Sequence, residues 1–206
     1  MGDAMKKYYT IEFKKGSYNH FFGGKNWKTP VCKNCNANYH QILLIDLNDP
    51  LFSHLRNSNE CTLPIVSCLN CSSCWDYQIF KVNHENEEIQ CISDTDTEHW
   101  INTDDTIESP LLQKNIIFIP VTHFNNSILD DLYSKMFVTG LGTPPLIDTH
   151  VDLQCPLCKN MMDYVVTITS DWTHIIKEID FVFGELFIYF FYCKKCGIMK
   201  TIGQGT

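Results

Sequence analysis

The sequence predicts an α+β fold that is mainly antiparallel β and is built from two similar halves, each holding a four-cysteine zinc site made of paired knuckles. Three observations lead to this prediction. Apolar residues make up 44% and charged residues 19% of the 206 residues, as in an ordinary globular chain. Short runs rich in β-branched and aromatic residues recur along the chain. Four Cys-x-x-Cys motifs account for most of the 11 cysteines.

The four motifs are regularly spaced. They are Cys32–Cys35, Cys68–Cys71, Cys155–Cys158 and Cys193–Cys196, with 32 residues between the first two motifs and 34 between the last two. Near-equal spacing is typical of an internal duplication. We therefore predict one compact domain over residues 1–206, with pseudo-repeat halves at about 8–93 and 140–206 joined by a linker and helix over 94–139.

Each half has the same predicted order of elements: a motif, a strand, a connection, a strand, a second motif and a final strand. The strands are expected over residues 39–47, 63–67 and 75–82 in the first half, and over 161–169, 186–192 and 198–202 in the second. Further strands are expected over 88–93 and over 116–121, where Pro120 indicates a strand end.

Two helices and one acidic loop complete the prediction. A short helix is expected over 50–56 with Asp49 as its cap, and a longer one over 127–137, where Ser127 is the N-cap and apolar residues recur at helical spacing. The stretch from Ser93 to Pro110 is polar and is expected to be a surface loop. Its acidic residues are Asp94, Asp96, Glu98, Asp104, Asp105 and Glu108.

The paired motifs predict two structural zinc ions. A Cys-x-x-Cys turn places two thiolates on one side of a tight knuckle, and two facing knuckles supply four sulfurs at tetrahedral positions about 2.3 Å from zinc. The ligands predicted for the first ion are Cys32, Cys35, Cys68 and Cys71, and those for the second are Cys155, Cys158, Cys193 and Cys196.

Alternatives to this assignment remain open at the sequence level. Cys74 lies in Cys-x-x-Cys register with Cys71, so it could replace Cys68 at the first site. The motifs could also be reduced core thiols without metal, or a redox pair, although they lie in Lys/Asn turns and not at helix starts. Cys61 and Cys91 are expected to be free thiols, and His40 and His150 lie near enough in sequence to support the ligands.

Catalytic signatures are missing from the sequence. Four cysteines close the shell of a zinc ion, whereas a catalytic zinc keeps one position for water or substrate. The chain has no His-Glu-x-x-His, no Gly-x-Ser-x-Gly and no nucleotide-binding glycine motif. We therefore expect a protein that is not an enzyme and has no catalytic residues.

Charge and apolar patterning narrow the class of partner and the compartment. The formal charge of −8 favours a basic protein partner and disfavours direct binding of nucleic acid. The longest apolar run, Leu186–Tyr192, is too short to span a bilayer, and the first residues show no signal sequence. A cytoplasmic location is therefore expected, and in that reducing compartment so many cysteines favour bound metal over disulfides.

Several of these motifs resemble the YwqG-like family. Gly23-Gly24-Lys25-Asn26-Trp27, followed by Pro30–Cys35 and Gln41–Leu47, is similar to the family pattern G-G-x-P-x-W, P-x-C-P-x-C and Q-I-D-L, with Asn26 at the position of its first Pro. The stretches 154–161 and 184–197 are also similar to it. The first part resembles the N-terminal region of the programmed cell death protein two family as well.

The resemblance implies a duplicated, mostly β protein that binds another protein. The YwqG-like family has no established enzyme activity, and some members are encoded in bacterial toxin and immunity neighbourhoods. The programmed cell death protein two relatives act as chaperones of a ribosomal protein. The sequence prediction is thus an immunity-type protein that neutralises a cognate toxin by direct binding, with a chaperone of a basic ribosomal or nucleic-acid-associated protein, or a hydrolase, as alternatives.

Overall fold

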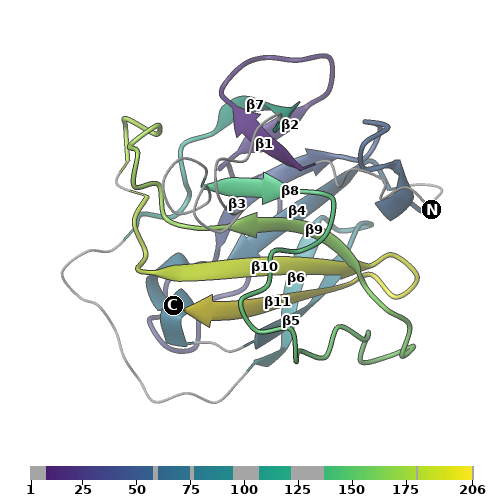
Figure 1. Ribbon diagram of the computed structural model, residues 1–206. Coiled ribbons are helices and arrows are strands. Elements are labelled where there is room, and N and C mark those ends of the chain that lie inside the picture. The colour runs from purple at the N-terminus through teal and green to yellow at the C-terminus, as the bar shows by residue number, and fades with distance from the viewer. Residues whose placement is uncertain are drawn as a thin grey trace.

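The computed structural model describes residues 8–57, 60–74, 77–94, 107–121, 137–179 and 181–205. They form one 11-stranded sheet with two short 3-10 helices (Figure 1). The strands are β1 (Tyr9–Glu12), β2 (His20–Phe22), β3 (His40–Asp46), β4 (Thr62–Ser67), β5 (Tyr77–Asn83), β6 (Glu88–Asp94), β7 (Lys114–Pro120), β8 (Val138–Gly140), β9 (Asp163–Ile168), β10 (Leu186–Cys193) and β11 (Ile198–Gly205). The 3-10 helices are η1 (Ser53–Leu55) and η2 (Leu69–Cys74).

The antiparallel part of the predicted fold is confirmed, but the α part is not. Every ladder between named strands is antiparallel, and the described residues contain no α-helix, so this part of the chain is nearly all β. The helix predicted over 50–56 is the single turn η1. Asp49 accepts the N–H of Leu51 in a local turn, and Arg56 is already extended, so the helix does not propagate. The helix predicted over 127–137 lies outside the described residues except for Phe137.

All the strands that the sequence predicts are present, and three others were not predicted. These are β1, β2 and β8, which have three or four residues each, too few for an alternating pattern to stand out. The predicted linker over 94–139 contributes β7 and β8 to the sheet. The two strands take the places next to β2 and β9, in the middle of the sheet.

The strand order is symmetric about the central pair formed by β7 and β1. The order is β4-β3-β2-β7-β1-β8-β9-β10-β11-β5-β6. Counted outward from the centre, one side of the sheet runs through β7, β2, β3 and β4, and the other side runs through β1, β8, β9 and β10. The central pair is joined to the strands on either side through β1–β8 and β7–β2.

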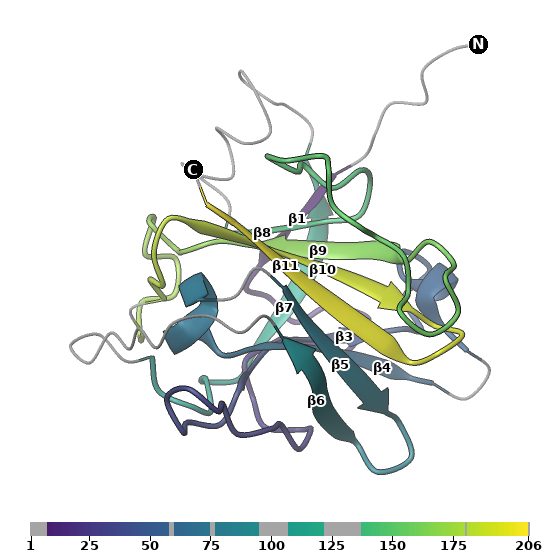
Figure 2. The same ribbon diagram turned by 90° about the horizontal axis from the view of Figure 1, so that it is seen from below.

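The sheet curls into two layers around a core. β9, β10 and β11 lie over β3 and β4, as Figure 2 shows from below. Alternate residues of β10, among them Ile188, Phe190 and Tyr192, join the main core with residues of β3 and β4. All eight residues of β10 are buried, because its other face is covered as well.

A second apolar cluster lies on the outer face of the sheet. Phe187, Tyr189 and Phe191 of β10 pack there with Tyr164 and Ile202. The chain between β8 and β9 covers this face and contributes Leu146, Val151 and Leu153, and the Tyr189 hydroxyl donates to the Pro145 carbonyl at 2.7 Å. This covering segment includes the Cys155–Cys158 motif. None of the helices among the described residues is long and apolar enough to cross a bilayer.

A left-handed turn after each second strand directs the chain towards its first knuckle. The Gly23 N–H donates to the Ile42 carbonyl of β3, and the Leu141 N–H donates to the Val165 carbonyl of β9. Gly23 has φ 68° and Leu141 has φ 63°. At Gly23 the left-handed turn also brings the backbone of residues 111–112 against the glycine, and a Cβ there would lie 2.5 Å from the Leu112 carbonyl oxygen.

The substitution Gly23→Ala should therefore lower the free energy of unfolding by at least about 2 kcal/mol, from left-handed strain plus the backbone clash. Gly205→Ala is the matched control, because a Cβ there meets ordinary van der Waals contacts, and it should change stability by less than about 0.5 kcal/mol. Chemical denaturation of both variants measures the difference. Equal stability would show that the turn at Gly23 is not constrained.

Candidate metal centres

The first motif of each half forms the same tight hairpin. The Cys32 N–H donates to the Ala37 carbonyl at 2.8 Å, and the Cys155 N–H donates to the Asn160 carbonyl at 2.8 Å. In each hairpin the N–H four residues after the first cysteine, on Asn36 or Lys159, returns to that cysteine's carbonyl. Both of these residues have φ near 60°. The hairpin brings both thiols of the motif to one side, just before β3 or β9.

The second motif of each half begins where a long strand ends. Cys68 follows β4, and Cys193 is the last residue of β10. In both motifs the N–H of the second cysteine donates to the carbonyl of the first, at 3.1 Å for Cys71 and 3.2 Å for Cys196. After this shared turn the halves differ. In the first half the turn is the start of η2, whereas in the second half Gly197, with φ 59°, closes the β10–β11 hairpin.

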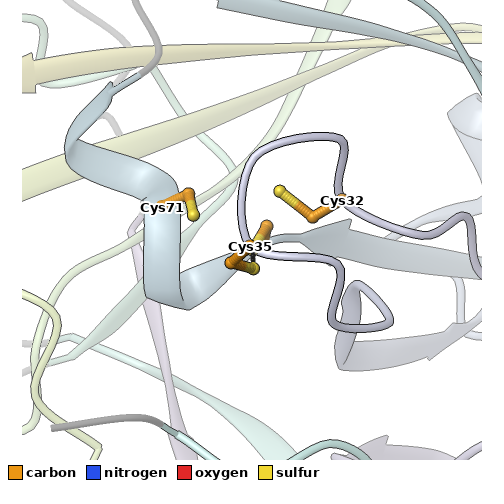
Figure 3. A group of neighbouring side chains, drawn as sticks. Cys32, Cys35 and Cys71 are labelled. Carbon is orange, nitrogen blue, oxygen red and sulfur yellow. Dashed lines mark hydrogen bonds between the residues drawn. The ribbon is translucent and has the colours of Figure 1, made fainter. Parts of the chain in front are cut away.

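These turns bring the eight predicted ligands together in two groups of four. In each group the four sulfur atoms lie within 4.8 Å of one another. Figure 3 shows the first group, in which the side chains of Cys32 and Cys35 on the hairpin and Cys71 on η2 converge. Cys68 completes this group. The side chain of Cys74, the alternative ligand suggested by the sequence, lies outside the described ones.

The spacing of the sulfur atoms suits a metal ion and not a disulfide. The Cys35 and Cys68 sulfurs are 3.5 Å apart, and those of Cys158 and Cys193 are 3.6 Å apart. A disulfide needs about 2.05 Å, whereas four sulfurs at 2.3 Å from a tetrahedral ion lie about 3.8 Å from one another. Every described cysteine is a free thiol. Each group could therefore hold one metal ion, and four sulfur donors select soft or borderline ions such as zinc and iron.

The thiols of each group perturb one another's protonation. Hydrogen bonds from Cys68 and Cys71 lower the pKa of Cys32. The hydrogen bond between Cys68 and Cys32 in turn raises the pKa of Cys68. In the second group a hydrogen bond from the Asn160 N–H lowers the pKa of Cys158 to about 7. Each group thus contains a thiol that is readily deprotonated, and a bound cation would promote loss of the remaining protons.

Polar side chains support the first group from within and from outside its motifs. The Asn34 amide donates to the Cys71 sulfur at 3.3 Å. Buried His40 accepts the N–H of Leu69, the residue after Cys68, and its other ring nitrogen contacts the Ile107 carbonyl at 3.0 Å. Burial lowers the pKa of His40, which favours the neutral ring that this pair of contacts requires. The suggestion from sequence that His40 supports a ligand turn agrees with these contacts.

The ends of the acidic stretch contact the first group. Asp94 forms an ion pair at 2.6 Å with Lys33, which lies between Cys32 and Cys35. Asn70, which lies between Cys68 and Cys71, accepts the Ile107 N–H at 2.8 Å and donates to the Ile107 carbonyl. The acidic residues from Asp96 to Asp105 lie outside the described residues.

Two lysines at the second group bind backbone carbonyls. The Lys81 ammonium on β5 donates to the Cys196 carbonyl at 2.6 Å, and Lys194 donates to the His54 carbonyl of the first half at 2.7 Å. Asn57 in turn donates to the Lys194 carbonyl. The last knuckle is thus attached to both halves. The Lys81 ammonium thus lies beside one ligand of a group that would carry a formal charge of −2 as a tetrathiolate bound to a divalent cation.

The remaining sequence candidates lie away from the thiol groups. Cys61 is exposed and Cys91 is half-buried, and neither belongs to a group. His150 is exposed and contacts Asp148, so it does not support a ligand. The sequence prediction missed the supporting contacts of Lys33, Asn34 and Asn70. Their place inside the motifs, next to the ligands, was the signal that could have revealed them.

An apolar groove beside the second group was not predicted. This groove, called the knuckle groove below, has a volume of about 420 Å³ and is lined by Tyr77, Ile79, Val151, Asp152, Gln154, Pro156, Lys159, Lys200 and Ile202. The adjoining hairpin exposes Leu157 and Met161, whose exposed fractions are 63% and 65%. The residues that line the knuckle groove come from three separate segments of the chain, so the groove could not be recognised from the sequence.

Comparison with known proteins finds no matching family model, no similar curated protein and no similar solved structure.

The substitution Cys193→Ser should destabilise the protein by several kcal/mol, against a total stability of about 5–15 kcal/mol, and should release one metal ion per chain. Loss of one ligand opens the shell and leaves three buried or half-buried thiols without their cation. Cys61→Ser is the control, because that thiol is exposed and outside both groups. Thermal melting and elemental analysis report the two effects. Equal melting temperatures and equal metal content for both variants would exclude the second group as a metal site.

Proposed function

We propose that the protein is a zinc-stapled protein-binding module and, more specifically, an immunity-type protein of the cytoplasm that neutralises a cognate toxin by direct binding. Zinc is the proposed metal at both groups because four cysteines form its commonest closed structural shell. The proposed role of the zinc ions is structural, since a shell of four thiolates has no position for a substrate.

The exposed apolar hairpin at the second metal centre carries this proposal. Leu157 and Met161 lie on a short, hydrogen-bonded turn that two of the ligands anchor to the sheet. The neighbouring covering segment exposes Ile147 as well. Clusters of exposed apolar residues beside a groove are typical of protein-binding surfaces. Complete burial of Leu157 or Met161 by a partner would contribute roughly 1.5–3 kcal/mol each.

Charge and family resemblance support the more specific part of the proposal. The net charge of −8 would accelerate association with a basic toxin domain and make the rate fall with salt. The YwqG-like resemblance connects the chain to toxin and immunity neighbourhoods. The same charge suits a chaperone of a basic ribosomal protein, which is the second candidate.

The test is affinity capture from the native host with three forms of the protein. The wild type and Val31→Ser should retain one specific partner, because Val31 is a comparably exposed apolar residue, 59%, on the hairpin of the first group. The double variant Leu157→Ser, Met161→Ser should lose it by at least tenfold while keeping its metal. Retention of the same partner by all three forms would contradict the proposal.

Identification of the captured protein separates the candidate functions. A toxin domain whose toxicity in cells is abolished by the wild type, and not by the double variant, supports the immunity role. A ribosomal protein whose solubility depends on the same residues supports the chaperone role. A small-molecule turnover that survives the double variant would favour the hydrolase.

A further inference from the structure

We propose that the knuckle groove binds a short acidic segment of a partner protein, in which one Asp or Glu lies next to large apolar residues. This inference rests on the proposed protein-binding function and adds the chemistry of what the surface recognises.

The apolar part of the groove is preformed. Ile79 of β5 and Ile202 of β11 belong to the outer apolar cluster, and the covering segment adds Val151 beside them. Pro156 lies between two ligands of the second group, so that group fixes its position. A pocket with fixed walls does not have to become ordered when a ligand enters, which favours insertion of an apolar side chain.

The groove also holds a lysine that is almost completely buried. Lys200 is 9% exposed on β11, its ammonium donates to the Asp152 carbonyl, and it lies 5.9 Å from the centre of the Tyr77 ring. Both contacts are with neutral groups, so they leave the positive charge in place. A charge in such a partly desolvated position interacts more strongly with a ligand carboxylate than a fully exposed lysine does.

The charged residues that line the groove have a net positive charge in a protein with a formal charge of −8. Lys159 and Lys200 outnumber Asp152, whose carboxylate accepts the N–H of Gln154 at 2.9 Å. The Lys81 ammonium is bound to the Cys196 carbonyl and the Lys194 ammonium to the His54 carbonyl, so neither faces the groove as one of its lining residues. Lys159 and Lys200 are thus left to attract a carboxylate, and the apolar walls attract its neighbours.

A partner protein that is basic overall can suit both the negative net charge of this protein and the positive charge of the knuckle groove. Long-range attraction depends on the net charges of the two proteins, whereas the groove contacts only a few residues of the partner. A protein that is basic overall and presents one acidic, apolar segment fits the whole-molecule charge and the local charge together.

The test uses two fluorescein-labelled peptides and the metal-loaded full chain. One peptide has three leucines alternating with two glutamates, and the other has glutamine in place of glutamate. Fluorescence polarisation at low salt should show the glutamate peptide binding at least tenfold more tightly. Lys159→Gln, a change at an exposed position, should reduce this preference, and Lys200→Met should reduce it further. Lys177→Gln, in the exposed loop at the other end of β9, should leave it unchanged.

Other outcomes would overturn the inference. These are equal affinity for both peptides, binding of neither peptide, or a preference that Lys159→Gln leaves intact. Sedimentation that reveals a dimer abolished by Leu157→Ser would assign the surface to a second copy of the chain. Capture of a host partner without a peptide preference would leave the proposed function standing and remove this inference. A peptide preference without host capture would support the ligand chemistry of the groove and count against the immunity and chaperone roles.

Discussion

The convergence of four thiols at the junction of two strands is the interaction on which the rest of this structure depends. In each half a hairpin before the first long strand meets the turn after the second, and the pairing of β3 with β4 or of β9 with β10 brings the two turns together. A metal ion at this point joins segments that are more than thirty residues apart in sequence. Because such an ion binds the folded arrangement and not the extended chain, its binding free energy becomes folding free energy.

The two halves use this junction differently after the shared turn. At the second group the chain returns as β11 beside β10, whereas at the first group η2 carries it to β5 on the far side of β11. β5 then presents Ile79 and Tyr77 on the outer face, next to the hairpin of the second group. The knuckle groove therefore exists because β5, the strand after the second motif of the first half, pairs with β11 of the second half. If the first half returned in a hairpin like that of β10 and β11, β5 would not lie beside β11 and the groove would not form.

Much of this architecture follows from local sequence patterns. The long strands were predictable because β-branched and aromatic residues persist over six to eight positions, and the ligand groups were predictable because spacing alone limits how four motifs can pair. The place of β1 in the middle of the sheet was not predictable, because a strand of four residues carries too little pattern to specify a partner. The groove was equally hidden, since Tyr77, Val151 and Lys200 share a surface only after β5 pairs with β11. The helix expected at 50–56 failed because Asp49 satisfies a turn there instead of a helix cap.

X-ray absorption at the zinc edge tests the central claim most directly, on protein purified without chelators and with its metal content measured on the same sample. The account predicts two zinc ions per chain, each surrounded by four sulfur atoms at about 2.3 Å, with no nitrogen or oxygen in the first shell. A shell that contains lighter atoms would contradict it. So would a sample with fewer than two bound ions that keeps the full melting temperature of the metal-loaded protein.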